Sequence, residues 1–189
     1  MSEFKTVIIV GSLRKDSINM KLAKALKKLG EGKFKAEILS IDLPLYNQDL
    51  ETNFPAPAAA FKNAIIAADG VLIVTPEYNR SVPGPLKNAI DWASRPYGKN
   101  AFAGKPTAII GTSSGAIGSA CAQQALKPIL NYLDVSLMGQ PEAYVQFKDG
   151  MIDAEGTITA EATQKFLGSY VDKFVAWVGK NSSSSAKAA

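Results

Sequence analysis

The chain has 189 residues, of which 47% are hydrophobic, and a formal net charge of +4. This length suits one domain with a single sizeable core, and the hydrophobic fraction is ordinary for a globular protein. The sequence contains no histidine and one cysteine, which excludes an intrachain disulfide, a Ser-His-Asp triad and nearly all catalytic zinc sites. If the protein is an enzyme, we therefore expect a bound cofactor to supply the chemistry.

Charge and hydropathy patterns also bear on the partners. The sequence has no dense basic patch with interleaved aromatic residues, so we expect no nucleic-acid partner. No apolar run approaches the roughly eighteen residues of a membrane-spanning helix, and the N-terminus runs into a strand-like segment without room for a secretory signal. We therefore expect no membrane partner and a cytoplasmic protein.

Strand-like and helical patterns alternate along the chain. Apolar runs of strand length occupy residues 6–10, 36–41, 71–75, 107–111 and 135–138. Helical patterns occupy residues 19–29, 58–68, 85–94, 119–133 and 159–178. This alternation predicts a parallel sheet with helices on both faces.

Two segments do not fit the alternation. Residues 43–57 contain three prolines and several polar side chains, so we expect them to wrap the surface irregularly, near a ligand site or a subunit contact. Residues 181–189 include four consecutive serines and show no packing pattern, which predicts a disordered tail. We therefore expect a single domain over residues 1–180.

The loop after the first strand-like run, residues 11–19, carries groups suited to an anion. Its glycine allows a tight turn, its serines and Asn19 supply hydroxyl and amide groups, and Arg14 supplies a planar charged fork that suits a phosphate. The free N–H groups of the following helix favour an anion at the same place. Taken alone, this first loop is better explained as a capped helix start with solvated charges.

Two further loops change that interpretation. The second loop, residues 75–85, has three prolines that restrict the backbone around polar and aromatic side chains that can contact a flat ligand. The third loop, residues 111–119, is rich in serine and glycine. Because open α/β sheets bind ligands at the carboxyl ends of their strands, the three loops predict one site for a ligand with a phosphate and a flat ring.

The motifs in these loops resemble a known family. They are Gly11-Ser12-x-Arg14-x-x-Ser17-x-Asn19, Pro76-Glu77-Tyr78-Asn79, Ser81-Val82-Pro83-Gly84, Leu86-Lys87-Asn88-Ala89-Ile90-Asp91-Trp92 and Gly111-Thr112-Ser113-Ser114-Gly115. They resemble the NAD(P)H-dependent FMN reductases, in particular the bacterial quinone, chromate and azo-dye reductase branch. The resemblance implies a flavodoxin-like, doubly wound α/β fold with a five-stranded parallel sheet of order 2-1-3-4-5. FMN would sit at the switch between the first and third strands.

The resemblance also implies roles for single residues. The first loop would hold the FMN phosphate, and the other two loops would line the isoalloxazine ring. The ten cofactor-binding residues would be Ser12, Arg14, Ser17, Asn19, Pro76, Glu77, Tyr78, Asn79, Ser113 and Gly115. Arg80 and Arg95 are candidates for attracting an anionic acceptor or the phosphate of NADPH, with surface solubility as the alternative. We expect no catalytic side chain and no metal, because the chemistry would occur at N5 of the flavin.

The implied activity is that of an FMN-dependent oxidoreductase. It would pass electrons from NADPH or NADH, in a ping-pong cycle, to quinones, azo compounds, chromate or other small acceptors, as a homodimer or homotetramer. One alternative is a flavodoxin-like electron carrier acting on a protein partner; the net positive charge and Arg14 disfavour it. The other alternative is a flavin-free α/β regulatory or structural domain.

Overall fold

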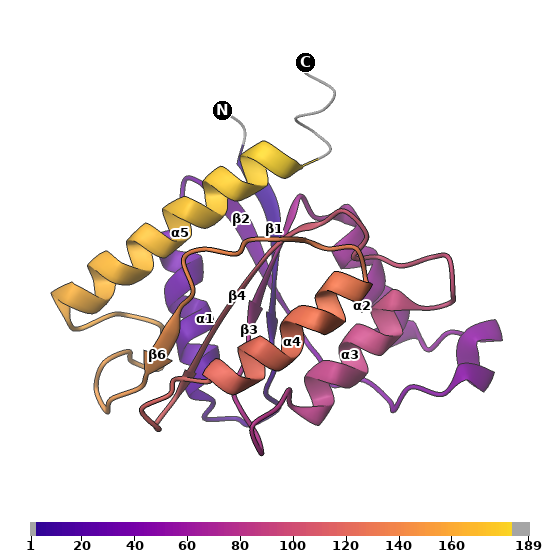
Figure 1. The fold of residues 1–189 in the computed structure, drawn as a ribbon, viewed down its shortest axis with the longest axis horizontal. Coiled ribbons are helices and arrows are strands. Elements are labelled where there is room, and N and C mark those ends of the chain that lie inside the picture. The colour runs from indigo at the N-terminus through magenta and orange to yellow at the C-terminus, as the bar shows by residue number, and fades with distance from the viewer. Residues whose placement is uncertain (1–2, 183–189) are drawn as a thin grey trace.

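A parallel sheet forms the centre of the computed structural model, which describes residues 3–182 (Figure 1). The strand order is β2-β1-β3-β4-β5, and β6 also pairs with β4. The strands are β1 (Phe4–Val10), β2 (Phe34–Leu39), β3 (Gly70–Val74), β4 (Pro106–Ser113), β5 (Ser136–Leu137) and β6 (Tyr144–Gln146). The predicted flavodoxin-like order is therefore confirmed.

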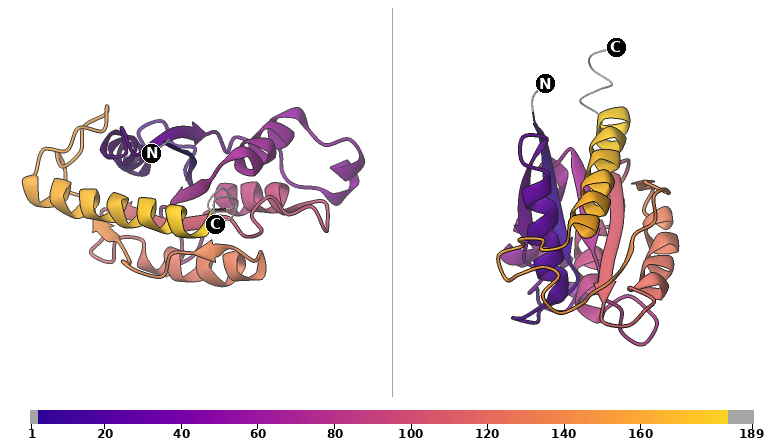
Figure 2. Two further views of the ribbon diagram at one scale, coloured as in Figure 1. Left: turned by 90° about the horizontal axis from the view of Figure 1, so that it is seen from above. Right: turned by 90° about the vertical axis from the view of Figure 1, so that its left-hand side faces the viewer.

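Helices cover both faces of the sheet. They are α1 (Ile18–Leu29), α2 (Ala56–Ala67), α3 (Gly84–Ser94), α4 (Ala120–Tyr132) and α5 (Glu161–Asn181), with a short 3₁₀ helix, η1 (Gln48–Thr52), before α2. Buried residues of α1 and α5 pack on one face, and those of α2, α3 and α4 pack on the other. The right-hand view of Figure 2 shows α1 and α4 on opposite sides of the strands.

The continuous apolar strands follow from this double cover. In β1, Ile8 and Val10 face the cluster with α1 and α5, whereas Val7 and Ile9 face the cluster with α2, α3 and α4. A parallel strand that is buried on both faces needs apolar residues at every position rather than at every second one. The same two-sided burial holds for β3, whose five residues are all buried.

The fifth strand is split, which the sequence did not indicate. The predicted strand at 135–138 is the two-residue β5, paired with the start of β4 through Pro106 and Thr107. Further along, β6 pairs with the end of β4, from Gly111 to Ser113. The two short strands together take the place of one, and β6 lies beside the third loop.

The start of the predicted tail differs from the structure. Asn181 is the last residue of α5 and Ser182 is its C-cap, so these two residues do not belong to the predicted tail. The rest of that tail, residues 183–189, lies outside the described residues. None of the helices within residues 3–182 is both long and apolar enough to cross a membrane.

Candidate functional site

The carboxyl ends of β1, β3 and β4 meet at one edge of the sheet, the lower edge in Figure 1. A cleft of about 170 Å³ lies there, lined by Ser12, Arg14, Ser17, Ile18, Asn19, Pro76, Glu77, Tyr78, Thr112, Ser113 and Ser114. The fold thus brings all three predicted loops to one cleft. Eight of the ten predicted cofactor residues line it; Asn79 and Gly115 do not, and neither do Arg80 and Arg95.

The first loop presents hydrogen-bond donors and a free cation. Ser17 caps α1 by accepting a hydrogen bond from the N–H of Met20 (3.3 Å), and the first N–H groups of a helix have no intrahelical acceptor. The hydroxyl of Ser12 accepts from the N–H of Arg14 (3.3 Å). The Arg14 side chain is exposed and forms no ion pair within residues 3–182. A free guanidinium beside a helix N-terminus suits a phosphate.

The amide of Asn19 is already engaged with the protein. Its Nδ2 donates to the carbonyl of Thr112 (2.9 Å), and its Oδ1 accepts from the N–H of the same residue (3.0 Å). The side chain is buried at the wall of the cleft. Asn19 therefore joins the first turn of α1 to the end of β4.

The second loop is a tight turn anchored by a buried carboxylate. Asn79 and Arg80 both have positive φ, at 50° and 62°, and Tyr78 and Ser81 exchange two backbone hydrogen bonds across the turn. Two consecutive residues with positive φ make the two-residue hairpin turn that fits twisted strands. The side chain of Glu77 is only 8% exposed, whereas Tyr78 is 55% exposed at the cleft. The turn thus leaves an aromatic ring open to a flat ligand.

The third loop runs close under the second. A Cβ added to Gly111 would lie 2.0 Å from the carbonyl oxygen of Thr75 and 2.3 Å from the Oγ of Ser119. Only glycine allows so close an approach of two backbones. Beyond it, the Oγ of Ser113 accepts from the N–H of Gly115 (3.1 Å), which turns the loop at the rim of the cleft.

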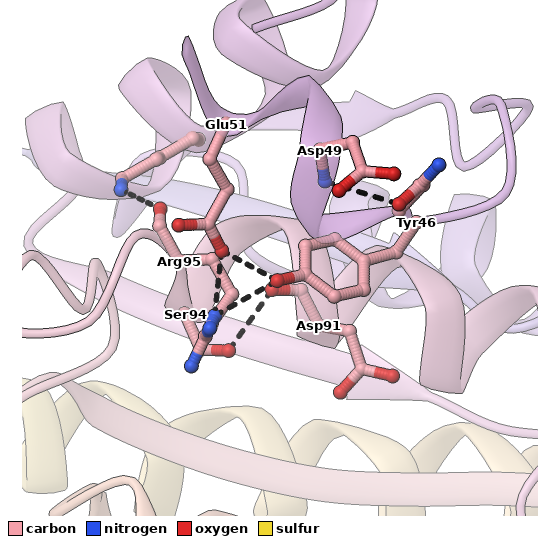
Figure 3. Close-up of polar contacts among 8 residues, drawn as sticks. Tyr46, Asp49, Glu51, Asp91, Ser94 and Arg95 are labelled. Carbon is pink, nitrogen blue, oxygen red and sulfur yellow. Dashed lines mark hydrogen bonds and ion pairs between the residues drawn. The ribbon is translucent and has the colours of Figure 1, made fainter.

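Arg95 lies away from the cleft, at the C-cap of α3. Its Nε donates to Glu51 Oε1 (2.8 Å) and to the hydroxyl of Tyr46 (3.0 Å), and that hydroxyl donates to the same Glu51 oxygen. Figure 3 shows the three side chains pointing toward one another. The network ties residues 43–55, which we call the excursion, to the C-terminal end of α3. The second loop lies at the other, N-terminal end of this helix. Within this chain Arg95 therefore holds the excursion in place.

The carboxylate of this network predicts a dependence on pH. Hydrogen bonds from Tyr46 and Arg95 lower the pKa of Glu51 from its ordinary value of 4.5. A group with a lower pKa in the folded state stabilises the fold above its unfolded pKa and loses that contribution as the pH falls through its folded pKa. We therefore expect the excursion to loosen as the pH falls below 4.5, and to be loose already at pH 7 in Glu51→Gln.

Hydrogen exchange of residues 43–55 measures this loosening. The exposed Glu31 provides the control, because Glu31→Gln changes the charge equally without touching the network. Wild-type protection of the excursion in Glu51→Gln at pH 7 would show that the carboxylate does not hold it.

The donors of the cleft fit FMN. The exposed guanidinium, the serine hydroxyls and the start of α1 suit its phosphate, and the open face of Tyr78 suits its ring. The volume of about 170 Å³ is below the roughly 300–1,000 Å³ of pockets that enclose a whole ligand. The cleft of this chain therefore encloses only part of such a ligand, so that with the phosphate at the first loop the ring would stay accessible from solvent.

Comparison with known proteins decides the family. A family model described as NADPH-dependent FMN reductase matches residues 4–150. The chain belongs to this family. This confirms the resemblance in its sequence: the protein is an FMN-dependent oxidoreductase with NAD(P)H as the electron donor.

Individual relatives of this reductase cover nearly the whole chain. It is 54% identical over 175 residues to a 2-hydroxy-1,4-benzoquinone reductase from Burkholderia sp., a match that covers 92% of this chain and 96% of that protein. It is 47% identical over 180 residues to a quinone reductase from Pseudomonas putida, covering 94% and 96%. The structure of FerB, a flavoenzyme NAD(P)H:(acceptor) oxidoreductase from Paracoccus denitrificans, is similar with a TM-score of 0.91 at 50% identity, covering 95% and 99%.

Three residues of the reductase's cleft were not among the predicted ligands: Ile18, Thr112 and Ser114. All three lie inside the motifs that carried the family resemblance. Ile18 opens α1, whereas Thr112 and Ser114 flank the predicted Ser113. Their positions in the first and third loops could have identified them as cleft residues, because a loop that lines a cleft does so through several consecutive residues.

Proposed function

We propose that the protein is a quinone reductase that holds FMN in the cleft at the ends of β1, β3 and β4. The observation that carries the proposal is its 54% identity, over 92% of the chain, to a protein named as a benzoquinone reductase. Bound FMN supplies the redox chemistry, by taking a hydride from NAD(P)H and giving two electrons to the acceptor. The balanced reaction converts NAD(P)H, a proton and a quinone into NAD(P)⁺ and a hydroquinone.

Different residues of the cleft bind different parts of FMN. Ser12, Ser17 and Arg14 hold the phosphate together with the start of α1, and Pro76 and Tyr78 support the ring. Among residues 3–182, Glu77 is the one carboxylate that lines the cleft, and both of its oxygens already accept hydrogen bonds. The proton that the acceptor takes up therefore comes from water rather than from a side chain.

An open cleft also accepts several substrates in turn. Donor and acceptor use the same accessible side one after the other, as a ping-pong order requires, and NADPH or NADH serves as donor. Azo compounds, chromate and other small acceptors are further substrates of the same kind. The partners are then small molecules rather than nucleic acids or membranes, and the protein works in the cytoplasm with its NAD(P)H pool.

Anaerobic stopped-flow absorbance tests the proposal. The FMN-loaded protein is mixed first with NADPH and then with benzoquinone, and the visible absorbance of the flavin is followed. Bleaching by NADPH and recovery with benzoquinone are expected. Retained FMN that NADPH does not bleach would favour an electron carrier, and failure to retain FMN would overturn the proposal.

Arg80 provides a test of donor preference. Its side chain is 73% exposed at the second loop and forms an ion pair with Glu77 through Nη1, so its other donors can reach a phosphate. We expect Arg80→Ala to raise the KM for NADPH by about threefold, the size of an exposed ion pair, and to leave the KM for NADH unchanged. Steady-state kinetics at low salt with both donors measures the difference; equal changes for NADPH and NADH would contradict this role.

We also propose that the protein assembles as a homodimer or homotetramer. A groove of about 750 Å³ lies between α3 and α4, and two exposed aromatic side chains, Tyr97 (84%) and Tyr132 (82%), flank it. Such exposed aromatics are typical of a surface that a second copy covers. Sedimentation velocity distinguishes two or four subunits from a monomer, and a single monomeric species at micromolar concentration would contradict the assembly.

A further inference from the structure

The three loops of the cleft are joined by few connections beyond the sheet. The pairing of β1 with β3 ends at Val10 and Val74, and the pairing of β3 with β4 ends at Val74 and Ile110. Past these residues, the side chains of Asn19 and Glu77 each bond a cleft loop to another element: Asn19 bonds to the end of β4, and Glu77 bonds to the start of α4. Each of them lies in the cleft wall. Both polar atoms of the Asn19 amide and Oε2 of Glu77 are bonded to protein backbone.

The first connection replaces a missing strand partner. On one side, Thr112 pairs with β6; on the other side, β3 has already ended, so no strand remains for its N–H and carbonyl groups. The amide of Asn19 takes both, at 3.0 and 2.9 Å, and is only 1% exposed. Because Asn19 is the second residue of α1, this pair fixes the first turn of α1 against β4. The same turn carries the N–H groups that would face the phosphate of FMN.

The second connection fixes the other end of the cleft. Glu77 Oε2 accepts from the N–H of Ala122 (3.1 Å) in the first turn of α4, and Oε1 accepts from Arg80 Nη1 (3.2 Å). The side chain is 8% exposed, and a carboxylate is favoured at a helix N-terminus. Glu77 stands between Pro76 and Tyr78, so its attachment to α4 sets the position of the loop that faces the ring.

We propose that Asn19 and Glu77 are positioning residues rather than FMN ligands, and that they act on opposite ends of the cofactor. Asn19 sets the phosphate end by holding the start of α1. Glu77 sets the ring end by holding the second loop to α4. The inference rests on the proposed binding of FMN in this cleft, and it predicts that the two ends can be weakened separately.

The experiment compares FMN with riboflavin, which has the same ring and no phosphate. Apoprotein is titrated with each flavin and the quenching of flavin fluorescence gives both dissociation constants. We expect Asn19→Ala and the milder Asn19→Ser to weaken FMN by roughly tenfold, the usual effect of losing a buried polar pair, and riboflavin by less than twofold. Glu77→Ala is expected to weaken both flavins by similar factors and to change the visible circular dichroism of bound flavin. Glu77→Gln should recover most of the affinity, because its amide oxygen can still accept from Ala122.

Asn100 provides a matched control for Asn19. Its amide also donates to a backbone carbonyl, that of Leu133, and accepts from a backbone N–H, that of Phe102, but it lies outside the cleft. Asn100→Ala should lower the thermal midpoint without changing the ratio of the two dissociation constants. Hydrogen exchange of the apoprotein adds a measurement that needs no flavin. If Asn19 positions the end of β4, Asn19→Ala should make the backbone N–H of Thr112 exchange faster. If Asn19 only bound the phosphate, that N–H would stay protected in the variant.

The outcomes separate the inference from the proposed function. Wild-type protein that binds neither flavin would overturn the proposed function itself. Wild-type binding of FMN with equal losses of both flavins in Asn19→Ala, or with an FMN-selective loss in Glu77→Ala, would overturn only the division of roles. An unchanged Thr112 amide in apo Asn19→Ala would overturn the positioning role of Asn19.

Discussion

Replacing Gly111 by alanine is expected to lower the free energy of unfolding by about 3 kcal/mol or more, at the upper end of overpacking effects. The new Cβ would meet the Thr75 carbonyl oxygen at 2.0 Å. The N–H of Thr75 donates to the carbonyl of Ile110 (2.9 Å), and the hydroxyl of Thr75 donates to the carbonyl of Pro76 (2.8 Å). Because these two hydrogen bonds hold Thr75, its own carbonyl has little room to move. The clash therefore displaces the second loop, and FMN binding should be lost with it.

Urea unfolding followed by circular dichroism measures the change, with Gly168→Ala as the control. Gly168 lies inside α5, where an added Cβ meets nothing within 4 Å. Alanine there should stabilise the protein by about 0.5–1 kcal/mol, the ordinary preference of a helix for alanine. A Gly111→Ala variant as stable as the wild type would mean that β4 and the second loop have more space between them than the structure shows.

Loss of the Arg14 guanidinium is expected to weaken FMN binding by about tenfold or more, as for hydrogen bonds between charged groups. The side chain is exposed and has no ion-pair partner within residues 3–182, so its removal costs the fold little and the effect falls on the ligand. Riboflavin affinity should not change in Arg14→Ala. The difference between the two flavins should shrink at high salt, because salt screens an exposed charge pair.

Two further variants define what Arg14 contributes. Arg14→Lys keeps the charge without the planar fork, so an intermediate affinity for FMN is expected. Lys15→Ala removes the neighbouring exposed cation and should leave FMN binding within twofold. Equal weakening by Arg14→Ala and Lys15→Ala would indicate that only the overall positive charge of the loop matters.

Much of the fold could be predicted because its elements are local. Strands buried on both faces show as unbroken apolar runs, such as residues 71–74, and each run is followed by a loop and a helical pattern. The rule that ligands bind at the carboxyl ends of strands then placed three separated loops at one cleft. Eight of the ten predicted cofactor residues line that cleft for this reason.

What sequence reasoning missed depends on partners far along the chain. The strand β6 has only three residues and is defined by its pairing with the end of β4. The amide of Asn19 meets a residue 93 positions away, and Arg95 meets Glu51, 44 positions away. No local pattern distinguishes such a side chain from a ligand, since both are polar residues in a motif. Only the three-dimensional structure shows which polar side chains are already hydrogen-bonded within the protein and which are free to bind the cofactor.

The split of the last strand also affects how the protein behaves at high concentration. A long, flat sheet edge invites another chain to add a strand and so begins aggregation. Here one edge consists of β5 and β6, of two and three residues, with residues 138–143 interrupting them. The opposite edge, β2, carries Lys35 and Glu37 within its six residues. Neither edge therefore offers an uninterrupted apolar template, and the reductase should remain dispersed where an unbroken edge strand would promote fibril formation.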